Sequence, residues 1–153
     1  MTKYNKLVFV CTGNTCRSPM AEAIYKSIDK ETEVKVFSRG LVVLFHEPIN
    51  PKAEVVLKKY DLEFSKHVSK GIKESEIDEN TLILTMTDAH KRKLLDAYSN
   101  TMNVHTIKEY VGESGDVFDP YGGSLVEYEE CYIELARLVK KTVYKLNEDN
   151  QTN

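Results

Sequence analysis

The sequence predicts an α/β fold: a single three-layer domain in which a four-stranded parallel sheet lies between helices on both faces. Its 153 residues fit one domain, since domains commonly contain roughly 100 to 150 residues. Strand-like runs alternate with segments of helical periodicity, the order expected of parallel strands joined by helical crossovers. The four runs are Lys6–Val10, Val34–Ser38, Thr81–Thr87 and Val104–Tyr110.

Two of these runs are apolar without interruption, at Leu7–Val10 and at Leu82–Leu84. A strand with one face in water would alternate apolar and polar residues. We therefore expect these two strands to be covered on both faces by helices.

Several residues predict where helices begin. Ser18–Pro19 and Asn50–Pro51 each place a capping residue before a proline, which is favoured at the first helical position. Asp88 is expected to cap the helical segment that follows it. Ser124 and Glu127 have the spacing of a capping box before a long final helix.

The final helix carries an apolar stripe that should lie against the sheet, and Cys131 within it is expected to be a small buried side chain. The stripe consists of Leu125, Tyr128, Cys131, Tyr132, Leu135, Leu138, Val139 and Leu146. The polar end, residues 147–153, is expected to be a frayed tail of a domain that covers residues 1–153.

Charge and composition exclude several classes of protein. A formal net charge of -3 gives no basic field for nucleic acid or an anionic membrane. No apolar run approaches the roughly 18 residues of a spanning helix, and the N-terminus lacks the apolar segment of a secretory signal. Three cysteines do not fit the even-numbered framework of small disulfide-rich domains. We expect a cytoplasmic monomer with reduced thiols and no nucleic-acid or membrane partner.

The segment Cys11–Ser18 resists a purely structural explanation. A glycine-containing loop between a strand and a helix aims backbone N–H groups and the positive helix end at one point, which makes an anion site. Arg17 adds a planar fork of donors for two phosphate oxygens. These positive groups favour the thiolate form of Cys11, the nucleophilic form. Because five residues separate Cys11 from Arg17, the loop can curl once around a phosphoryl group, with Ser18 placed to hydrogen-bond the sulfur.

Two other motifs do not fit this segment. A Walker A loop needs a second glycine followed by Lys and Ser or Thr, which are absent. A zinc site needs about four ligands, and Cys11, Cys16 and Cys131 lack such a partner pattern. We expect no metal and no organic cofactor, since the loop and Arg17 supply the electrostatics that a metal would provide.

The second segment of interest is GDVFDPYGGS, which contains Asp116 and Asp119. Phosphoryl transfer through a cysteine requires a proton for the leaving group and later a base that activates water. Asp119 is the better candidate because Pro120 restricts it to an extended conformation within a glycine-rich loop.

Together, CTGNTCRSP near the N-terminus and DPYGGS near the C-terminus resemble the low-molecular-weight protein tyrosine phosphatase family, over the chain to about Leu146. The resemblance implies a protein phosphatase that acts on phosphorylated proteins through a cysteinyl-phosphate intermediate. It makes Cys11 the nucleophile, Arg17 the phosphate clamp, and Asp119 the general acid and then the base. The phosphate-binding loop would comprise Thr12, Gly13, Asn14, Thr15, Cys16, Arg17 and Ser18.

The resemblance also implies supporting roles. Asn14, Ser18, Ser38 and His67 would hold the loop through side-chain hydrogen bonds, and asparagine suits a turn with positive φ. The remaining histidines match no family position, and we expect surface or packing roles for them. They are His46, His90 and His105.

Thr15 bears on the substrate. Phosphotyrosine enzymes usually have an aliphatic residue here, whereas Thr, with TGNT and KEYVGESGDV, resembles the bacterial protein arginine phosphatase branch. A guanidinium N–H buried without a partner costs about 1 to 3 kcal/mol, and the Thr15 hydroxyl and Asp119 could accept such bonds. Tyr121 could stack on the planar group. We favour phosphoarginine as substrate, with phosphotyrosine as the alternative.

Two further classes and one regulatory hypothesis remain. Arsenate reductases with a similar loop use downstream cysteines, and none lies between Arg17 and Cys131. A non-catalytic phosphoprotein-binding module would need neither the thiolate of Cys11 nor Asp119. Cys16 shares the curved loop with Cys11, so we expect it to be a redox partner that forms a reversible, protective disulfide.

Overall fold

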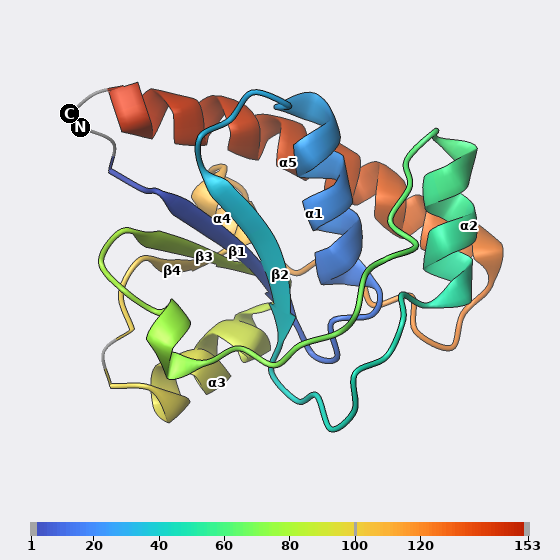
Figure 1. Ribbon diagram of the computed structural model, residues 1–153, viewed down its shortest axis with the longest axis horizontal. Helices are drawn as coiled ribbons and strands as arrows, with labels where there is room; N and C mark the ends of the chain where they lie inside the picture. Colours follow the sequence, from blue (N-terminus) through green and yellow to red (C-terminus); the bar gives the residue numbers. More distant parts are fainter. Residues whose placement is uncertain (1–2, 100, 152–153) are drawn as a thin grey trace.

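Four parallel strands form the centre of the computed structural model, which describes residues 3–99 and 101–151 (Figure 1). The strands are β1 (Lys6–Cys11), β2 (Lys35–Gly40), β3 (Thr81–Thr85) and β4 (Val104–Thr106). Their spatial order is β2-β1-β3-β4, and each neighbouring pair is parallel. The predicted sheet is confirmed, with β1 in an inner position.

Helices cover both faces of this sheet. They are α1 (Arg17–Ile28), α2 (Pro51–Lys59), α3 (Asp88–Ala97), α4 (Ile107–Tyr110) and α5 (Leu125–Gln151), with a 3-10 turn, η1, at Glu74–Glu76. Leu7 and Phe9 of β1 belong to a large core with residues of α1 and α5, whereas Val8 and Val10 belong to a smaller core with Leu94 of α3. Figure 1 shows α1 and α5 together on one face and α3 on the other. The predicted three layers are confirmed.

Two predicted strands are shorter than expected. β3 ends at Thr85 rather than Thr87, and β4 ends at Thr106 rather than Tyr110. The Thr106 hydroxyl accepts a hydrogen bond from the Glu109 N–H at 3.0 Å, while the Glu109 carboxylate accepts one from the Thr106 N–H at 2.8 Å. This capping box starts α4 where the β-branched residues favoured a longer strand.

Two of the predicted helix caps are confirmed. Asn50 Oδ1 accepts from the Lys52 N–H at 2.9 Å, with Pro51 in the first turn of α2. Ser124 and Glu127 form the reciprocal pair of a capping box before α5, with N···O distances of 3.2 and 3.3 Å.

The other two predicted caps are wrong. Cys16 occupies the N-cap position of α1 and makes no side-chain cap, so Ser18 lies inside the first turn. Asp88 is the first residue of α3, and Thr87 caps this helix by accepting from the His90 N–H. The Ser18 hydroxyl is therefore available to the loop that precedes it.

The predicted frayed tail is wrong as far as Gln151, because α5 continues to that residue. The Asn150 side chain accepts from the Tyr4 N–H at 2.9 Å and donates to the Tyr4 carbonyl at 3.1 Å. This pair ties the last turns of α5 to the segment before β1. The rest of that prediction, residues 152–153, lies outside the described residues.

The apolar stripe of α5 is buried as predicted, with one exception. Leu125, in the first turn, is 48% exposed, whereas Cys131 is 2% exposed and packs in the large core. Among the helices described here, none has the length and apolarity required to cross a bilayer.

Candidate active site

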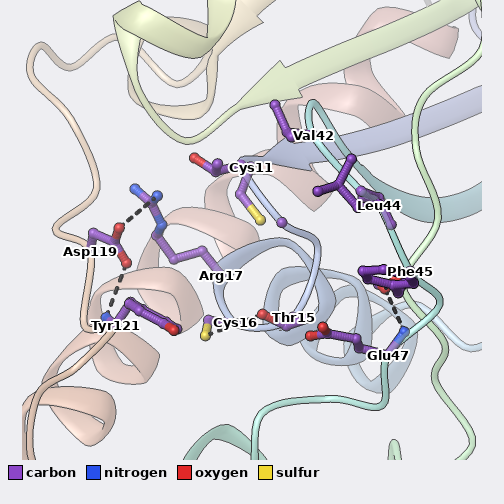
Figure 2. A pocket seen from close by; sticks show the side chains of 14 residues that line it. Cys11, Thr15, Cys16, Arg17, Val42, Leu44, Phe45, Glu47, Asp119 and Tyr121 are labelled. Carbon is purple, nitrogen blue, oxygen red and sulfur yellow. Dashed lines mark hydrogen bonds and ion pairs between the residues drawn. The ribbon is translucent and has the colours of Figure 1, made fainter.

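A pocket of about 390 Å³ opens at the carboxyl edge of the sheet (Figure 2). Its lining includes residues of the loop between β1 and α1, of the segment after β2, and of the loop before α5. The structure brings eight of the predicted residues together in this lining: Cys11, Thr12, Gly13, Thr15, Cys16, Arg17, Asp119 and Tyr121.

Backbone contacts from the end of β2 hold the start of the loop. The Leu41 N–H donates to the Cys11 carbonyl and the Val42 N–H to the Thr12 carbonyl, each at 3.0 Å. Gly40 lies so close that a Cβ there would be 2.9 Å from the Thr12 carbonyl oxygen. Position 40 therefore requires glycine, because the end of β2 touches the loop backbone.

Asn14 is the centre of a buried network behind the loop. Its φ is +58°, and its side chain is fully buried. Asn14 Oδ1 accepts from the Lys70 N–H at 3.0 Å, which turns the amide so that Nδ2 donates to Ser18 Oγ at 2.8 Å and to Ser38 Oγ at 2.9 Å. The Asn14 carbonyl accepts from His67 Nε2 at 2.8 Å. The predicted support residues therefore lie together, all in contact with Asn14.

This network favours one direction for the hydrogen bond at Cys11. Because Ser18 Oγ accepts from Asn14, its own proton is left to donate, and the Cys11 sulfur at 3.0 Å is a closer acceptor than the Arg39 carbonyl at 3.4 Å. Ser38 donates its proton to Glu22 at 2.7 Å. A hydroxyl proton aimed at sulfur stabilises a thiolate. Glu22 was not predicted, because its local sequence is that of any helical glutamate, yet only 7% of it is exposed.

Arg17 and Asp119 form an ion pair at one side of the pocket (Figure 2), with Arg17 Nη2 3.4 Å from Asp119 Oδ2. The Arg17 side chain is 5% exposed and also donates to the Val117 carbonyl at 3.0 Å. The second carboxylate oxygen of Asp119 accepts from the Tyr121 N–H at 3.1 Å. Asp116 instead accepts from a backbone N–H at the start of α3. Of the two carboxylates considered from the sequence, only Asp119 lines the pocket.

Cys16 directs its thiol towards α5. Its sulfur lies 3.6 Å from the Tyr128 hydroxyl and 3.8 Å from Thr15 Oγ1. Burial raises the pKa of Cys16 above its ordinary value, and the hydrogen bonds to Tyr128 and Thr15 partly oppose this. Cys16 is therefore a protonated thiol at neutral pH. Cys11 and Cys16 are both free cysteines here, so their disulfide stays a prediction.

One wall of the pocket was not predicted. Leu44 and Phe45 are 82% and 75% exposed, and with Val42 and Glu47 they line the pocket on the side away from Asp119 (Figure 2). The signal in the sequence is the run LVVLF, which is apolar yet follows directly on the end of a strand. Apolar side chains in a loop at the carboxyl edge of a parallel sheet indicate a ligand-binding surface.

His90 is a second unpredicted contact of the loop. It is buried in the first turn of α3, and its Nε2 lies 2.9 Å from Thr12 Oγ1. Burial lowers the pKa of His90 to about 4, and the charge of Arg17 contributes in the same direction. The available signal was its position just after β3, at the edge of the sheet where Cys11 also ends its strand.

Within residues 3–99 and 101–151, no three or more His, Cys, Asp or Glu side chains are arranged to hold a metal ion. The expectation that the reaction requires no metal or organic cofactor stays a prediction.

Comparison with known proteins gives a consistent result. Residues 6–152 match the sequence profile of the family described as low molecular weight phosphotyrosine protein phosphatase. A protein-arginine-phosphatase of Bacillus subtilis is 38% identical over 149 residues, 95% of this chain and 99% of the relative. The low molecular weight protein-tyrosine-phosphatase PtpB of Staphylococcus epidermidis is 40% identical over 141 residues, 92% of this chain and 98% of the relative.

Solved structures show the same likeness. A YwlE arginine phosphatase, a cysteine-to-serine mutant with a phosphorylated active-site serine, matches with a TM-score of 0.89 at 36% identity, covering 97% of this chain and 99% of the other. A low molecular weight protein tyrosine phosphatase from T. tengcongensis matches with a TM-score of 0.87 at 39% identity, covering 92% and 98%. The chain therefore belongs to the low-molecular-weight protein tyrosine phosphatase family and is a phosphatase.

Proposed function

We propose that this phosphatase hydrolyses phosphoarginine on proteins, through a cysteinyl-phosphate intermediate on Cys11. One observation carries the choice of substrate: the Thr15 hydroxyl and the Asp119 carboxylate line the same pocket as the Cys11 thiol and Arg17. They supply hydrogen-bond acceptors beside the place where a guanidinium would carry its phosphoryl group. The Bacillus subtilis relative named protein-arginine-phosphatase, 38% identical to this chain, supports the proposal.

The first chemical step uses Cys11 and Asp119. The Ser18 proton and the loop N–H groups favour the Cys11 thiolate, while Arg17 orients the phosphoryl oxygens. The sulfur attacks phosphorus and forms the P–S bond as the P–N bond breaks. The electron pair of that bond stays on the guanidine nitrogen, which takes a proton from protonated Asp119. The products are a cysteinyl phosphate and an unmodified arginine side chain.

The second step returns the enzyme to its starting state. Water attacks phosphorus while the Asp119 carboxylate accepts a proton from it, and the P–S bond breaks. Cys11 leaves as a thiolate, which the Ser18 hydroxyl stabilises from 3.0 Å. The phosphorylated active-site serine in the cysteine-to-serine YwlE mutant supports phosphoryl transfer to the corresponding position of this loop.

Substrate choice depends on the atoms next to phosphorus. The guanidinium of phosphoarginine carries N–H donors there, and a donor buried without a partner costs about 1 to 3 kcal/mol. Thr15 combines a β-branched shape with a hydroxyl acceptor, and protonated Asp119 adds a second acceptor in the carboxyl oxygen that carries no proton. Tyr121, which follows Asp119 closely and is 75% exposed, offers a ring face for the planar group.

The second candidate substrate is phosphotyrosine. Leu44, Phe45 and Tyr121 present exposed apolar or aromatic side chains at the pocket, and these would suit a phenyl ring. The PtpB relative of Staphylococcus epidermidis is named a protein-tyrosine-phosphatase. A phenol oxygen as leaving group would need only the proton from Asp119, so the same two steps apply.

We place the reaction in the cytoplasm, on phosphorylated protein substrates. All three cysteines are free, and a reducing compartment would keep them so. The thiolate chemistry of Cys11 depends on that state.

The test compares kcat/KM on matched phosphoarginine and phosphotyrosine peptides. The wild type is expected to prefer phosphoarginine, and Thr15→Ile to lose roughly 10- to 100-fold on that peptide because a buried donor loses its acceptor. Thr15→Ser, which keeps the hydroxyl, is the matched variant and is expected to keep the preference. Cys11→Ser serves as the blank.

The outcomes separate the two candidates. A preference for phosphotyrosine in the wild type and in Thr15→Ile would make Thr15 incidental and the enzyme a tyrosine phosphatase. Turnover by Cys11→Ser equal to that of the wild type would contradict the cysteinyl-phosphate mechanism for either substrate.

A further inference from the structure

His90 contacts the phosphate-binding loop, here called the phosphate loop, at Thr12. The predicted support residues contact it at Asn14, on the other side of Gly13. It is 5% exposed, and its Nε2 lies 2.9 Å from Oγ1 of Thr12, the residue after the nucleophile. Thr12 lines the pocket. His67 holds the carbonyl of Asn14 at 2.8 Å. Two histidines therefore hold the loop, one on each side of its glycine.

The second ring nitrogen indicates the direction of the hydrogen bond between His90 and Thr12. His90 Nδ1 is buried and has no hydrogen-bond partner among the described residues. A neutral imidazole has one N–H donor and one acceptor nitrogen. Buried N–H groups without a partner are rarer than unpaired acceptors. We therefore place the His90 proton on Nε2, which donates to Thr12 Oγ1 and leaves the Thr12 hydroxyl hydrogen free.

The charges around His90 keep the ring neutral. Burial is the largest cause that lowers the pKa of His90, to about 4, and the positive charges of Arg17 and Lys93 act in the same direction. Asp119 and Asp116 act in the opposite direction with smaller effect. These groups come from α1, from α3 itself and from the loop before α5. At neutral pH the ring is thus a single-proton donor.

We propose that His90 is a positioning residue, which fixes the Thr12 hydroxyl at the pocket so that its proton is donated to an oxygen of the bound phosphoryl group. Loss of this hydrogen bond should weaken phosphate binding and lower the reaction rate, because a hydrogen bond to a charged group is worth roughly 10- to 100-fold in an equilibrium or rate constant. The inference rests on the proposed role of the loop as the phosphate site. It does not depend on the choice between phosphoarginine and phosphotyrosine, because both present the same phosphoryl oxygens.

Three variants and two readouts test the proposal. Thr12→Val removes the hydroxyl, His90→Leu removes the donor, and His90→Gln keeps an amide N–H near the position of Nε2. The readouts are kcat and KM on the better phosphopeptide, and the inhibition constant of inorganic phosphate. Thr12→Val and His90→Leu are each expected to lower kcat/KM and weaken phosphate inhibition roughly 10-fold or more. His90→Gln is expected to retain most of both.

The double variant separates positioning from mere stability. Thr12→Val leaves the buried His90 N–H without an acceptor, so it should lower the melting temperature. Adding His90→Leu removes that donor and should restore part of the melting temperature, but not the activity. Because both residues act through one hydrogen bond, the double variant should be no less active than the less active of the two single variants. His105→Leu, a histidine on β4 away from the pocket, is the control for loss of a histidine.

A pH series gives an independent readout of the buried ring. The folded pKa of His90, about 4, lies below the ordinary 6.5, so the unfolded chain takes up a proton first as the pH falls. The wild type should therefore lose stability from about pH 6.5 towards pH 4, and His90→Gln should lose less. His67 and His105 also have lowered pKa values, so the dependence should shrink without vanishing.

Several results would overturn the proposal. One is an unchanged kcat and phosphate inhibition in Thr12→Val, and another is a loss in His90→Gln as large as in His90→Leu. Multiplicative losses in the double variant would also contradict it. If His90→Leu does not fold, Thr12→Val and His90→Gln still decide. Wild-type turnover by Cys11→Ser would instead count against the proposed function.

Discussion

The phosphate loop and the apolar wall formed by Val42, Leu44 and Phe45 line one pocket, but the loop is fixed by buried hydrogen bonds and the wall is exposed. Asn14 and Ser18 are fully buried and hydrogen-bonded to one another, whereas Leu44 and Phe45 are 82% and 75% exposed. The chemistry proposed for Cys11 requires a fixed position of its sulfur relative to Arg17, and many contacts hold the loop that carries both residues. Recognition of a protein substrate requires only a surface, which the core does not constrain.

This difference predicts two kinds of mutational effect. A change in the loop network should lower the free energy of unfolding and kcat together, because the same hydrogen bonds hold the fold and the sulfur. A change in the wall should alter KM while the melting temperature and kcat stay constant. Asn14→Ala, with the largest expected effect, and Phe45→Ala, with the smallest, test this separation, and Cys16→Ala tests a redox role within the loop.

Asn14→Ala is expected to have the largest effect. It removes the hydrogen bonds to Ser18, Ser38 and the Lys70 N–H, and it places alanine at a φ of +58°. We expect a loss of about 3 to 5 kcal/mol in the free energy of unfolding and at least a roughly 100-fold lower kcat. Urea unfolding and steady-state kinetics measure the two quantities.

The control for this variant is Asp61→Ala, at an exposed residue with a φ of +63°. It carries the backbone strain without the buried network, so it should lose only about 1 to 2 kcal/mol and no activity. Equal losses in the two variants would mean that the network contributes little and that the comparison of loop and wall does not hold.

The second prediction concerns Cys16, whose thiol faces Tyr128 at 3.6 Å. In the predicted redox switch, peroxide oxidises the Cys11 thiolate to a sulfenic acid, and the Cys16 thiolate then displaces hydroxide to form the disulfide. We expect dithiothreitol to restore most of the wild-type activity after peroxide but only a small part in Cys16→Ala. Because burial raises the pKa of Cys16, protection should improve as the pH rises from 7 towards 9.

Cys131→Ala is the matched control, since Cys131 is a buried cysteine of α5 whose thiol donates to the Phe118 carbonyl at 3.6 Å. It should recover like the wild type. Full recovery in Cys16→Ala would remove the redox role and leave Cys16 as a buried residue of the loop.

Residues of the site that lie in short motifs could be predicted from the sequence, whereas contacts between distant residues could not. Cys11, Arg17 and Asp119 lie in short motifs, so their approach in space follows from the order of strands and loops. The contact of His90 with Thr12 joins residues 78 positions apart, and no local pattern encodes it. The end of α5 was mispredicted for a similar reason, because Asn150 is fixed by Tyr4 at the other end of the chain.

The helical start at Thr106 was a different kind of error. Its capping box with Glu109 is visible in the sequence, but the β-branched residues before it favoured a longer strand. Local signals conflicted there, whereas at His90 the position just after a strand was a signal that did not identify Thr12 as its partner.

Phe45→Ala should have the smallest effect and tests the wall directly. Removing a side chain that is 75% exposed should change the free energy of unfolding by less than about 0.5 kcal/mol and leave kcat unchanged. Lost apolar contact with the substrate should raise KM on a phosphopeptide roughly 3- to 10-fold. Tyr144→Ala, at a similarly exposed aromatic on α5, is the control and should leave KM unchanged. If kcat falls with KM in Phe45→Ala, the wall also fixes the reacting groups, and loop and wall act as one unit in catalysis.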